Sequence, residues 1–182
     1  MDVKPGRGLV RLSGVGNDPA LVTFCREEWP RLVGSLSLYV GSRELAEDLA
    51  QEALYRACRH WRSVGAAESP SAWAHRVAFN LAKSHGRRQS SWRRAQPRLV
   101  GPSATTLVDP ADVIAVRVAV AALPETQRAV IVLRYFTQLS IAEVAAVMRC
   151  PENTVKTHTR RGLEALRSSG LLADDAPIEE TG

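Results

Sequence analysis

The segment that most constrains this chain runs from Ala122 to Arg167 and carries the pattern of a helix-turn-helix. Ser140 and Glu143 stand at the spacing of a capping box, which predicts the start of a short helix with apolar residues at helical spacing. The following Arg149-Cys150-Pro151 predicts a break, with the proline placed where a new helix can begin. A second helix is therefore expected directly after this break.

The second helix separates into an apolar side and a polar side. Its apolar side is formed by Val155, Thr159, Leu163 and Leu166. Its polar side is formed by Asn153, Lys156, Thr157, Arg160 and Arg161. Amide, hydroxyl and cationic groups are the types that contact base edges and phosphates in the major groove. A surface helix with a solvated basic face is the simpler alternative, but the helix–break–helix spacing favours DNA binding.

The composition favours an all-helical protein, because aromatic residues make up only 5% of the 182 residues and long alternating β-type runs are missing. No apolar run approaches the ~20 residues that cross a bilayer. We see no secretion signal, so we expect a cytoplasmic protein without membrane insertion. The cysteines at positions 25, 58 and 150 are widely spaced and show no metal-ligand pattern, so we expect reduced thiols and neither metal nor cofactor.

Charge changes sign along the chain. No acidic residue stands between Glu68 and Asp109. That interval holds the positive charges of Arg76, Lys83, Arg87, Arg88, Arg93, Arg94 and Arg98. The helix expected just upstream is acidic and contains Glu44, Glu47, Asp48 and Glu52. A polyanion would bind the basic stretch and be repelled by the acidic helix, which we therefore expect to face a basic protein surface.

Two amphipathic helices carry these charges. The acidic helix is expected from about Ser42 to Trp61, and an ordinary solvated acidic face is its simpler alternative. The basic helix is expected from Pro70 to Arg88, with Trp73, Val77, Leu81 and Phe79 on its buried side. Its opposite side gathers Arg76, Asn80, Lys83, Ser84 and Arg87. An amide among cations can read a base as well as a phosphate.

The pattern divides the chain into five segments. Residues 1–18 lack periodicity and are expected to be disordered, whereas residues 19–88 form a first helical unit. Residues 89–108 have the composition of a linker. Residues 109–169 form a four-helix unit that ends in the helix-turn-helix, and residues 170–182 form an acidic tail. The expected fold is therefore all-α, with two small helical domains joined by a flexible linker.

Two blocks of the chain, within residues 19–168, resemble the extracytoplasmic-function (group IV) sigma factors of bacterial RNA polymerase. The run AEDLAQEALYRACRHW followed by SPSAWAHRVAFNLAKSHGRR is similar to the second conserved region of that family. The run ALPETQRAVIVLRYFTQLSIAEVAAVM with TVKTHTRRGLEALR is similar to the fourth. The first block is the more specific one, because helix-turn-helix units are common in unrelated proteins.

The resemblance implies an alternative sigma factor that binds core polymerase and directs promoter-specific transcription initiation. The positions that would contact the β′ clamp helices are Asp48, Gln51 and Glu52. The positions that would contact the −10 element are Arg76, Asn80, Lys83, Arg87 and Arg88. The positions that would contact the −35 element are Asn153, Thr154, Lys156, Thr157, Arg160 and Arg161. The β flap of the polymerase and an anti-sigma factor are further partners that the resemblance implies.

The sequence departs from the family at His158, where members usually carry arginine, and Thr-Val-Lys-Thr-His is closer to regulators of the LuxR type. A stand-alone LuxR-like regulator is therefore the alternative hypothesis. Its N-terminal half would have to sense a ligand, yet that half is strongly basic where a ligand pocket needs apolar walls. An enzyme is not expected, because the histidines are dispersed and no phosphate-binding loop occurs.

Overall fold

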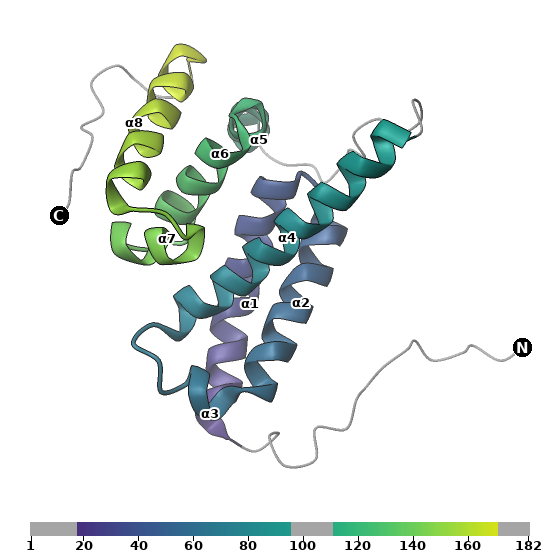
Figure 1. Cartoon of the computed structure of the whole chain (residues 1–182), viewed down its shortest axis with the longest axis vertical. Helices are drawn as coiled ribbons and strands as arrows, with labels where there is room; N and C mark the ends of the chain where they lie inside the picture. The colour runs from purple at the N-terminus through teal and green to yellow at the C-terminus, as the bar shows by residue number, and fades with distance from the viewer. Residues whose placement is uncertain (1–17, 96–110, 171–182) are drawn as a thin grey trace, which may run out of the picture.

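The computed structural model describes residues 18–95 and 111–170, and over these ranges it contains helices and no strands (Figure 1). The N-terminal unit consists of α1 (Pro19–Val40), α2 (Arg43–Arg59), α3 (Trp61–Val64) and α4 (Pro70–Ala95). The C-terminal unit consists of α5 (Ala111–Ala122), α6 (Glu125–Ile131), the π-helical η1 (Val132–Phe136), α7 (Ile141–Met148) and α8 (Glu152–Ser168). The prediction of an all-α fold is confirmed.

The ends of the first helices follow from local sequence signals. Asp18 caps α1, because its Oδ1 accepts a hydrogen bond of 2.9 Å from the amide of Ala20, and Pro19 occupies the first helical position. Gly41 ends α1 with a φ of 75°, which glycine adopts without steric cost. Ser42 then caps α2, at the position where the acidic helix is expected to begin. A single left-handed residue therefore turns the chain from α1 into the acidic helix.

Helix α4 is longer than the sequence predicts. It continues past Arg88 to Ala95, so the first part of the expected linker 89–108 is helical. The reason is that no proline occurs before Pro97, and the intervening residues are compatible with a helix. The remainder of that linker, the expected disordered segment up to residue 17 and the acidic tail from residue 171 lie outside the described residues.

The buried face of α4 is also shifted from the predicted one. Trp73, Val77 and Leu81 are only half-buried, although all three pack against the core. The fully buried positions are Ala74, His75, Ala78, Phe79 and Ala82. The alanines recur every four residues, and their small side chains let α4 approach its neighbours closely. The helix is thus held between α1 and α2 on one side and α7 on another.

The helix-turn-helix forms as predicted. The capping box is complete: Oγ of Ser140 accepts from the amide of Glu143 at 3.2 Å, and Oε2 of Glu143 accepts from the amide of Ser140 at 2.8 Å. Helix α7 ends at Met148, its C-cap Arg149 has a left-handed φ of 55°, and α8 begins directly after Pro151. The turn therefore fixes how the second helix leaves the first.

Helix α8 crosses α6 at Gly162. A Cβ at this position would stand 2.7 Å from Cγ1 and 3.0 Å from Cδ1 of Ile131, which is itself buried. The absence of a side chain at Gly162 is therefore what allows α8 to lie so close to α6.

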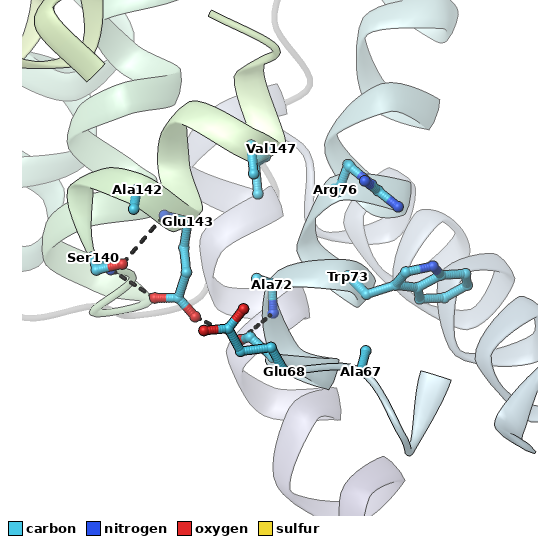
Figure 2. A pocket seen from close by; sticks show the side chains of 11 residues that line it. Ala67, Glu68, Ala72, Trp73, Arg76, Ser140, Ala142, Glu143 and Val147 are labelled. Carbon is cyan, nitrogen blue, oxygen red and sulfur yellow. Dashed lines mark hydrogen bonds between the residues drawn. The ribbon is translucent and has the colours of Figure 1, made fainter. Parts of the chain in front are cut away.

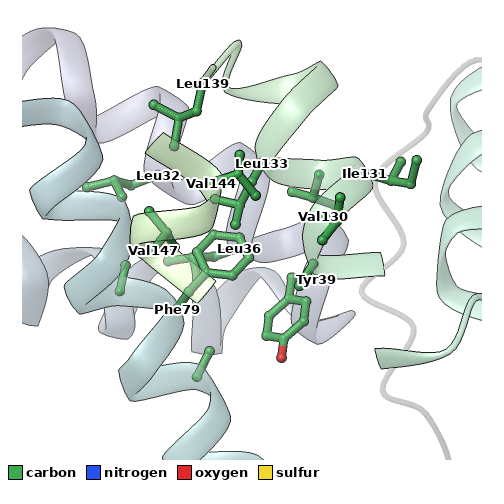
Figure 3. Packing of buried hydrophobic residues seen from close by; sticks show 14 of the residues in the cluster. Leu32, Leu36, Tyr39, Phe79, Val130, Ile131, Leu133, Leu139, Val144 and Val147 are labelled. Atoms are coloured by element: carbon green, nitrogen blue, oxygen red, sulfur yellow. The ribbon is translucent and has the colours of Figure 1, made fainter. Parts of the chain in front are cut away.

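The two units share one hydrophobic core (Figure 3). Leu32, Leu36 and Tyr39 of α1 and Phe79 of α4 meet side chains of the C-terminal unit. The partners in that unit include Val130, Leu133, Leu139, Val144 and Val147. The prediction of two helical units joined by a linker contains no such packing, which is the main difference between prediction and structure.

Candidate nucleic-acid interface

The acidic helix α2 presents its predicted polymerase-contacting residues to solvent. Asp48 and Gln51 are exposed, and Glu52 is half-exposed with its Oε1 2.8 Å from Nε of Arg56. Arg43 and Glu47 form a second ion pair one turn apart on the same helix, at 2.9 Å. Exposed pairs of this kind stabilise a helix by only about 0.3–0.5 kcal/mol, so they can exchange for a partner's charges at little cost.

Helix α4 carries a basic stripe formed by Arg76, Asn80, Lys83 and Arg87, hereafter the α4 stripe. Arg76, Asn80 and Lys83 are half-buried, whereas Arg87 and the neighbouring Arg88 are exposed. Nζ of Lys83 lies 3.8 Å from Sδ of Met148 at the end of α7. The stripe that the sequence predicts therefore exists, but part of it faces the C-terminal unit rather than solvent.

Two cavities border the α4 stripe where the two units meet. The larger, of about 600 Å³, lies between the loop before α4 and α7, and Trp73 and Arg76 line it together with Glu143 (Figure 2). The smaller, of about 380 Å³, is lined by Lys83 and Arg87 on one side and by residues of α6 on the other. Both cavities thus lie between −10 candidates and the C-terminal unit.

The recognition helix α8 has the two sides that the sequence predicts. Val155, Leu163 and Leu166 are buried, and Thr159 is half-buried with its hydroxyl donating to the carbonyl of Val155. The exposed candidates are Asn153, Lys156, Thr157, Arg160 and Arg161, while Thr154 is half-buried. Arg160 pairs with Glu164 one turn on, at 2.7 Å, with both side chains exposed. In Figure 1, α8 lies on the side of the C-terminal unit remote from α1 and α2.

A buried polar group links the two units. Glu28 is 4% exposed, and its Oε1 accepts a hydrogen bond of 3.0 Å from Arg31. Arg31 also donates to the carbonyl of Thr137 in the C-terminal unit, at 3.1 Å. Nε2 of the fully buried His75 lies 3.5 Å from Oε2 of Glu28. Burial raises the pKa of Glu28, but His75 and Arg31 outweigh it and hold the pKa below its usual range.

A second polar contact between the units is made by Glu143, the capping residue of α7. Its Oε1 accepts a hydrogen bond of 2.5 Å from the hydroxyl of Ser69 at the start of α4. Partial burial raises the pKa of Glu143, but the hydrogen bonds from Ser69 and Ser140 outweigh it and lower the pKa. The carboxylate of Glu143 thus caps α7 and also connects α7 to the N-terminal unit by a hydrogen bond (Figure 2).

Sequence reasoning did not predict these contacts between the units. The sequence does contain a sign that Glu28 is buried, because this charged residue lies on the same helix face as apolar ones. Glu28 stands seven residues after Leu21 and four before Leu32, both of which are buried. His75 stands in the same relation to Phe79, four residues on. Such residues mark a buried polar group, although their partners cannot be inferred from spacing.

The described residues show neither a helix long and apolar enough to cross a membrane nor a cluster of side chains suited to hold a metal ion. Cys25 and Cys58 lie with their sulfur atoms 3.8 Å apart between α1 and α2, and both are free thiols. Burial, and then the neighbouring Cys58, raises the pKa of Cys25 to about 12.

Both units match known family models. Residues 25–92 match the model of sigma-70 region 2, and residues 114–166 match that of sigma-70 region 4. The chain is 32% identical over 143 residues to the ECF RNA polymerase sigma factor SigW of Bacillus subtilis (strain 168), covering 70% of this chain and 76% of that one. The chain belongs to the extracytoplasmic-function sigma factors. It is therefore an alternative sigma factor, which directs RNA polymerase to initiate transcription at specific promoters.

Other relatives agree with this family. The sigma factor is 32% identical over 179 residues to the ECF sigma factor SigC of Mycobacterium tuberculosis, covering 92% of this chain and 89% of that one. It also resembles the solved sigma factor RpoE in complex with the anti-sigma factor NepR from Bartonella quintana. The TM-score is 0.69 at 22% identity, over 85% of this chain and 98% of that one, which shows a shared fold. A stand-alone LuxR-like regulator is not favoured, because the N-terminal unit matches a sigma region as well.

Proposed function

We propose that this sigma factor divides its contacts among three helices. Helix α2 binds core polymerase through Asp48, Gln51 and Glu52. Helix α4 binds the −10 element through Arg76, Asn80, Lys83, Arg87 and Arg88. Helix α8 binds the −35 element through Asn153, Thr154, Lys156, Thr157, Arg160 and Arg161.

The segregation of charge over these three helices carries the proposal. Carboxylates are exposed on α2, and cations and an amide are exposed on α8. The cations and the amide of α4 are half-buried where the two units meet, and they become exposed at Arg87 and Arg88. A polyanion is attracted to α4 and α8 and repelled by α2. The acidic face of α2 is instead complementary to a basic protein surface. The exposed face of α8 also carries the types of group that read bases in the major groove. In a helix-turn-helix, the second helix lies in that groove, and α8 is the second helix here.

The proposal assigns a role to each segment of the chain. Residues 19–88 bind polymerase and the −10 element, and residues 109–169 bind the −35 element. Residues 89–108 connect the two units, while residues 1–18 and 170–182 flank them. The protein has no catalytic activity of its own and needs no metal or cofactor, since the chemistry belongs to the polymerase. It acts in the cytoplasm, where core polymerase and promoter DNA meet.

The β flap of the polymerase and an anti-sigma factor complete the proposed set of partners. Support for an inhibitor comes from the Bartonella quintana structure, in which a sigma factor of the same fold is bound to NepR. An inhibitor of this kind would have to compete with the polymerase for the N-terminal unit, the C-terminal unit or both.

Replacing Asp48 with arginine tests the assignment of α2. Asp48 is exposed, so the variant should keep its fold while losing at least about tenfold in affinity for core polymerase, which corresponds to about 1.4 kcal/mol. The measurement is co-elution with core polymerase in gel filtration, together with transcription from a cognate promoter. Glu27→Arg on α1 makes the same change of charge at another exposed position and should co-elute like the unmodified protein. A folded Asp48→Arg variant that still joins core polymerase would remove α2 from the interface.

A further inference from the structure

We propose that Arg149, in the turn of the helix-turn-helix, is a further DNA-binding residue that holds a backbone phosphate beside the −35 element. This role adds to the proposed binding of that element by α8 and depends on it. Two observations lead to it: the backbone of Arg149 has a conformation that is unfavourable for arginine, and the fold makes no use of the charged side chain.

Arg149 has a left-handed backbone conformation at the end of α7, with a φ of 55° and a ψ of 50°. This conformation costs free energy in any residue that has a Cβ, whereas glycine adopts it freely. The chain places glycine in the left-handed region where α1 ends and where α8 has ended, at Gly41 with a φ of 75° and at Gly170 with a φ of 76°. The presence of arginine at the end of α7 is therefore not explained by the backbone.

The fold uses the backbone of Arg149 but not its side chain. The amides of Arg149 and Cys150 both donate to the carbonyl of Ala145 and so close the end of α7. A glycine at position 149 would make the same bond. The Arg149 side chain is exposed, and within the described part of the chain it has no hydrogen bond or ion pair, not even with Glu152, the nearest carboxylate in the sequence. The guanidinium group is thus available to a partner.

The place of Arg149 in the helix-turn-helix indicates that this partner is DNA. Arg149 stands two residues before Pro151, the N-cap of α8, and shortly before Asn153 and Lys156 on the exposed face of α8. In a helix-turn-helix the first residues of the second helix contact base edges, while the first helix crosses the sugar-phosphate backbone. The turn between the two helices therefore lies where this backbone borders the groove. The donors of a guanidinium group match the geometry of a phosphate.

A phosphate contact at Arg149 has a different effect from the contacts on α8. Phosphate contacts fix the position of a protein on the duplex without reading its sequence, and they release counterions. On α8 itself, Arg160 is already paired with Glu164. Arg149 would therefore strengthen binding to every −35 sequence alike, whereas the exposed face of α8 discriminates between sequences.

The substitution Arg149→Gly tests this role, because it removes the cation and relieves the backbone at the same time. Arg149→Lys keeps the positive charge. Gln138→Gly is the matched control, because Gln138 is the other non-glycine residue with a positive φ among those that the structure describes, and it is exposed and uncharged. Each variant is assembled with core polymerase, and urea unfolding of the free variants measures their stability.

The affinity of each holoenzyme is measured at several salt concentrations on two promoter duplexes. The first is a duplex that the unmodified holoenzyme selects from a pool randomised in the −35 element. The second is the same duplex with that element scrambled. Binding of each variant to core polymerase is measured separately, so that a loss of DNA binding is not confused with a loss of assembly.

We expect Arg149→Gly and Gln138→Gly each to raise the midpoint of urea unfolding by about 0.5 M, because both relieve a left-handed residue. Only Arg149→Gly should weaken DNA binding, by about tenfold at low salt. It should also reduce the slope of log affinity against log salt by about one. The loss should be equal on both duplexes, and Arg149→Lys should retain most of the affinity.

An Arg149→Gly holoenzyme with unchanged affinity and salt slope would overturn the proposal. So would a loss confined to the selected duplex, which would make Arg149 a base-reading residue, or a loss of affinity for core polymerase instead of DNA. Lys156→Ala separates this failure from a failure of the −35 role of α8. If Lys156→Ala weakens binding and Arg149→Gly does not, only the role of Arg149 is refuted; if neither does, the role of α8 is refuted as well.

Discussion

Replacing Gly162 with alanine tests how closely the recognition helix α8 approaches α6. In an exposed helix interior this substitution stabilises a protein by about 0.8–1 kcal/mol, because alanine has the higher helix propensity. At Gly162 the new methyl group would stand 2.7 Å from Cγ1 of the buried Ile131. Overpacking of this kind costs about 1–3 kcal/mol. We therefore expect a net destabilisation of about 1 kcal/mol.

A double-mutant cycle with Ile131→Ala isolates the contact. Ile131→Ala alone should cost about 2–5 kcal/mol, since it leaves a cavity in the core. In that background the alanine at Gly162 has room, and its helix propensity should then stabilise the protein by about 1 kcal/mol. The double variant should thus be about 2 kcal/mol more stable than the sum of the single effects predicts.

Equilibrium urea unfolding followed by circular dichroism measures each corner of the cycle. Gly34→Ala is the matched control, because Gly34 lies inside α1 and nothing stands within 4 Å of the position of its Cβ. That substitution should stabilise the protein by about 0.5–1 kcal/mol. If Gly162→Ala stabilises the protein as much as the control does, the close approach of α8 to α6 is wrong.

Two further predictions follow from the pKa shifts. The pKa values of Glu28 and Glu143 are lowered from 4.5 in the folded protein, so both carboxylates contribute stability above pH 4.5. This stability is lost as the pH falls through their folded pKa values. Urea titrations between pH 7 and pH 3 should show the loss, and Glu143→Gln should make it smaller. The pKa of Cys25 is raised from 9.0 to about 12, so its thiolate at pH 8 is about a thousandfold rarer than that of an unperturbed cysteine. Mass spectrometry after alkylation should therefore find Cys25 labelled rapidly only in the unfolded protein. Rapid labelling of the native protein would contradict the burial of this thiol.

The parts of the fold that depend on neighbouring residues could be predicted from the sequence. The capping box of Ser140 and Glu143, the break at Pro151 and the two sides of α8 all follow from spacing within one or two helical turns. The same holds for the start of α2 at Ser42. Periodicity therefore sufficed to find the recognition helix, and the family comparison supports its assignment to region 4.

The parts that depend on distant residues could not be predicted. Ser69 and Glu143 are 74 positions apart, and Arg31 and Thr137 are 106 apart, so no local pattern connects them. The buried face of α4 was placed on its larger apolar residues, although the alanines at 74, 78 and 82 allow the closer packing. Hydrophobicity says that a residue will be buried; it does not say which helix will cover it.

The shared core has a consequence for anyone who exchanges units between relatives to build new promoter specificities. A chimera that keeps α1 and α4 of this sigma factor but takes its C-terminal unit from a relative replaces Leu133, Val144 and Val147, which pack against Leu32, Leu36 and Phe79. The two packing surfaces of such a chimera come from different proteins and did not evolve together. The swap is better made on the exposed residues of α8 alone, because those side chains are absent from the common core.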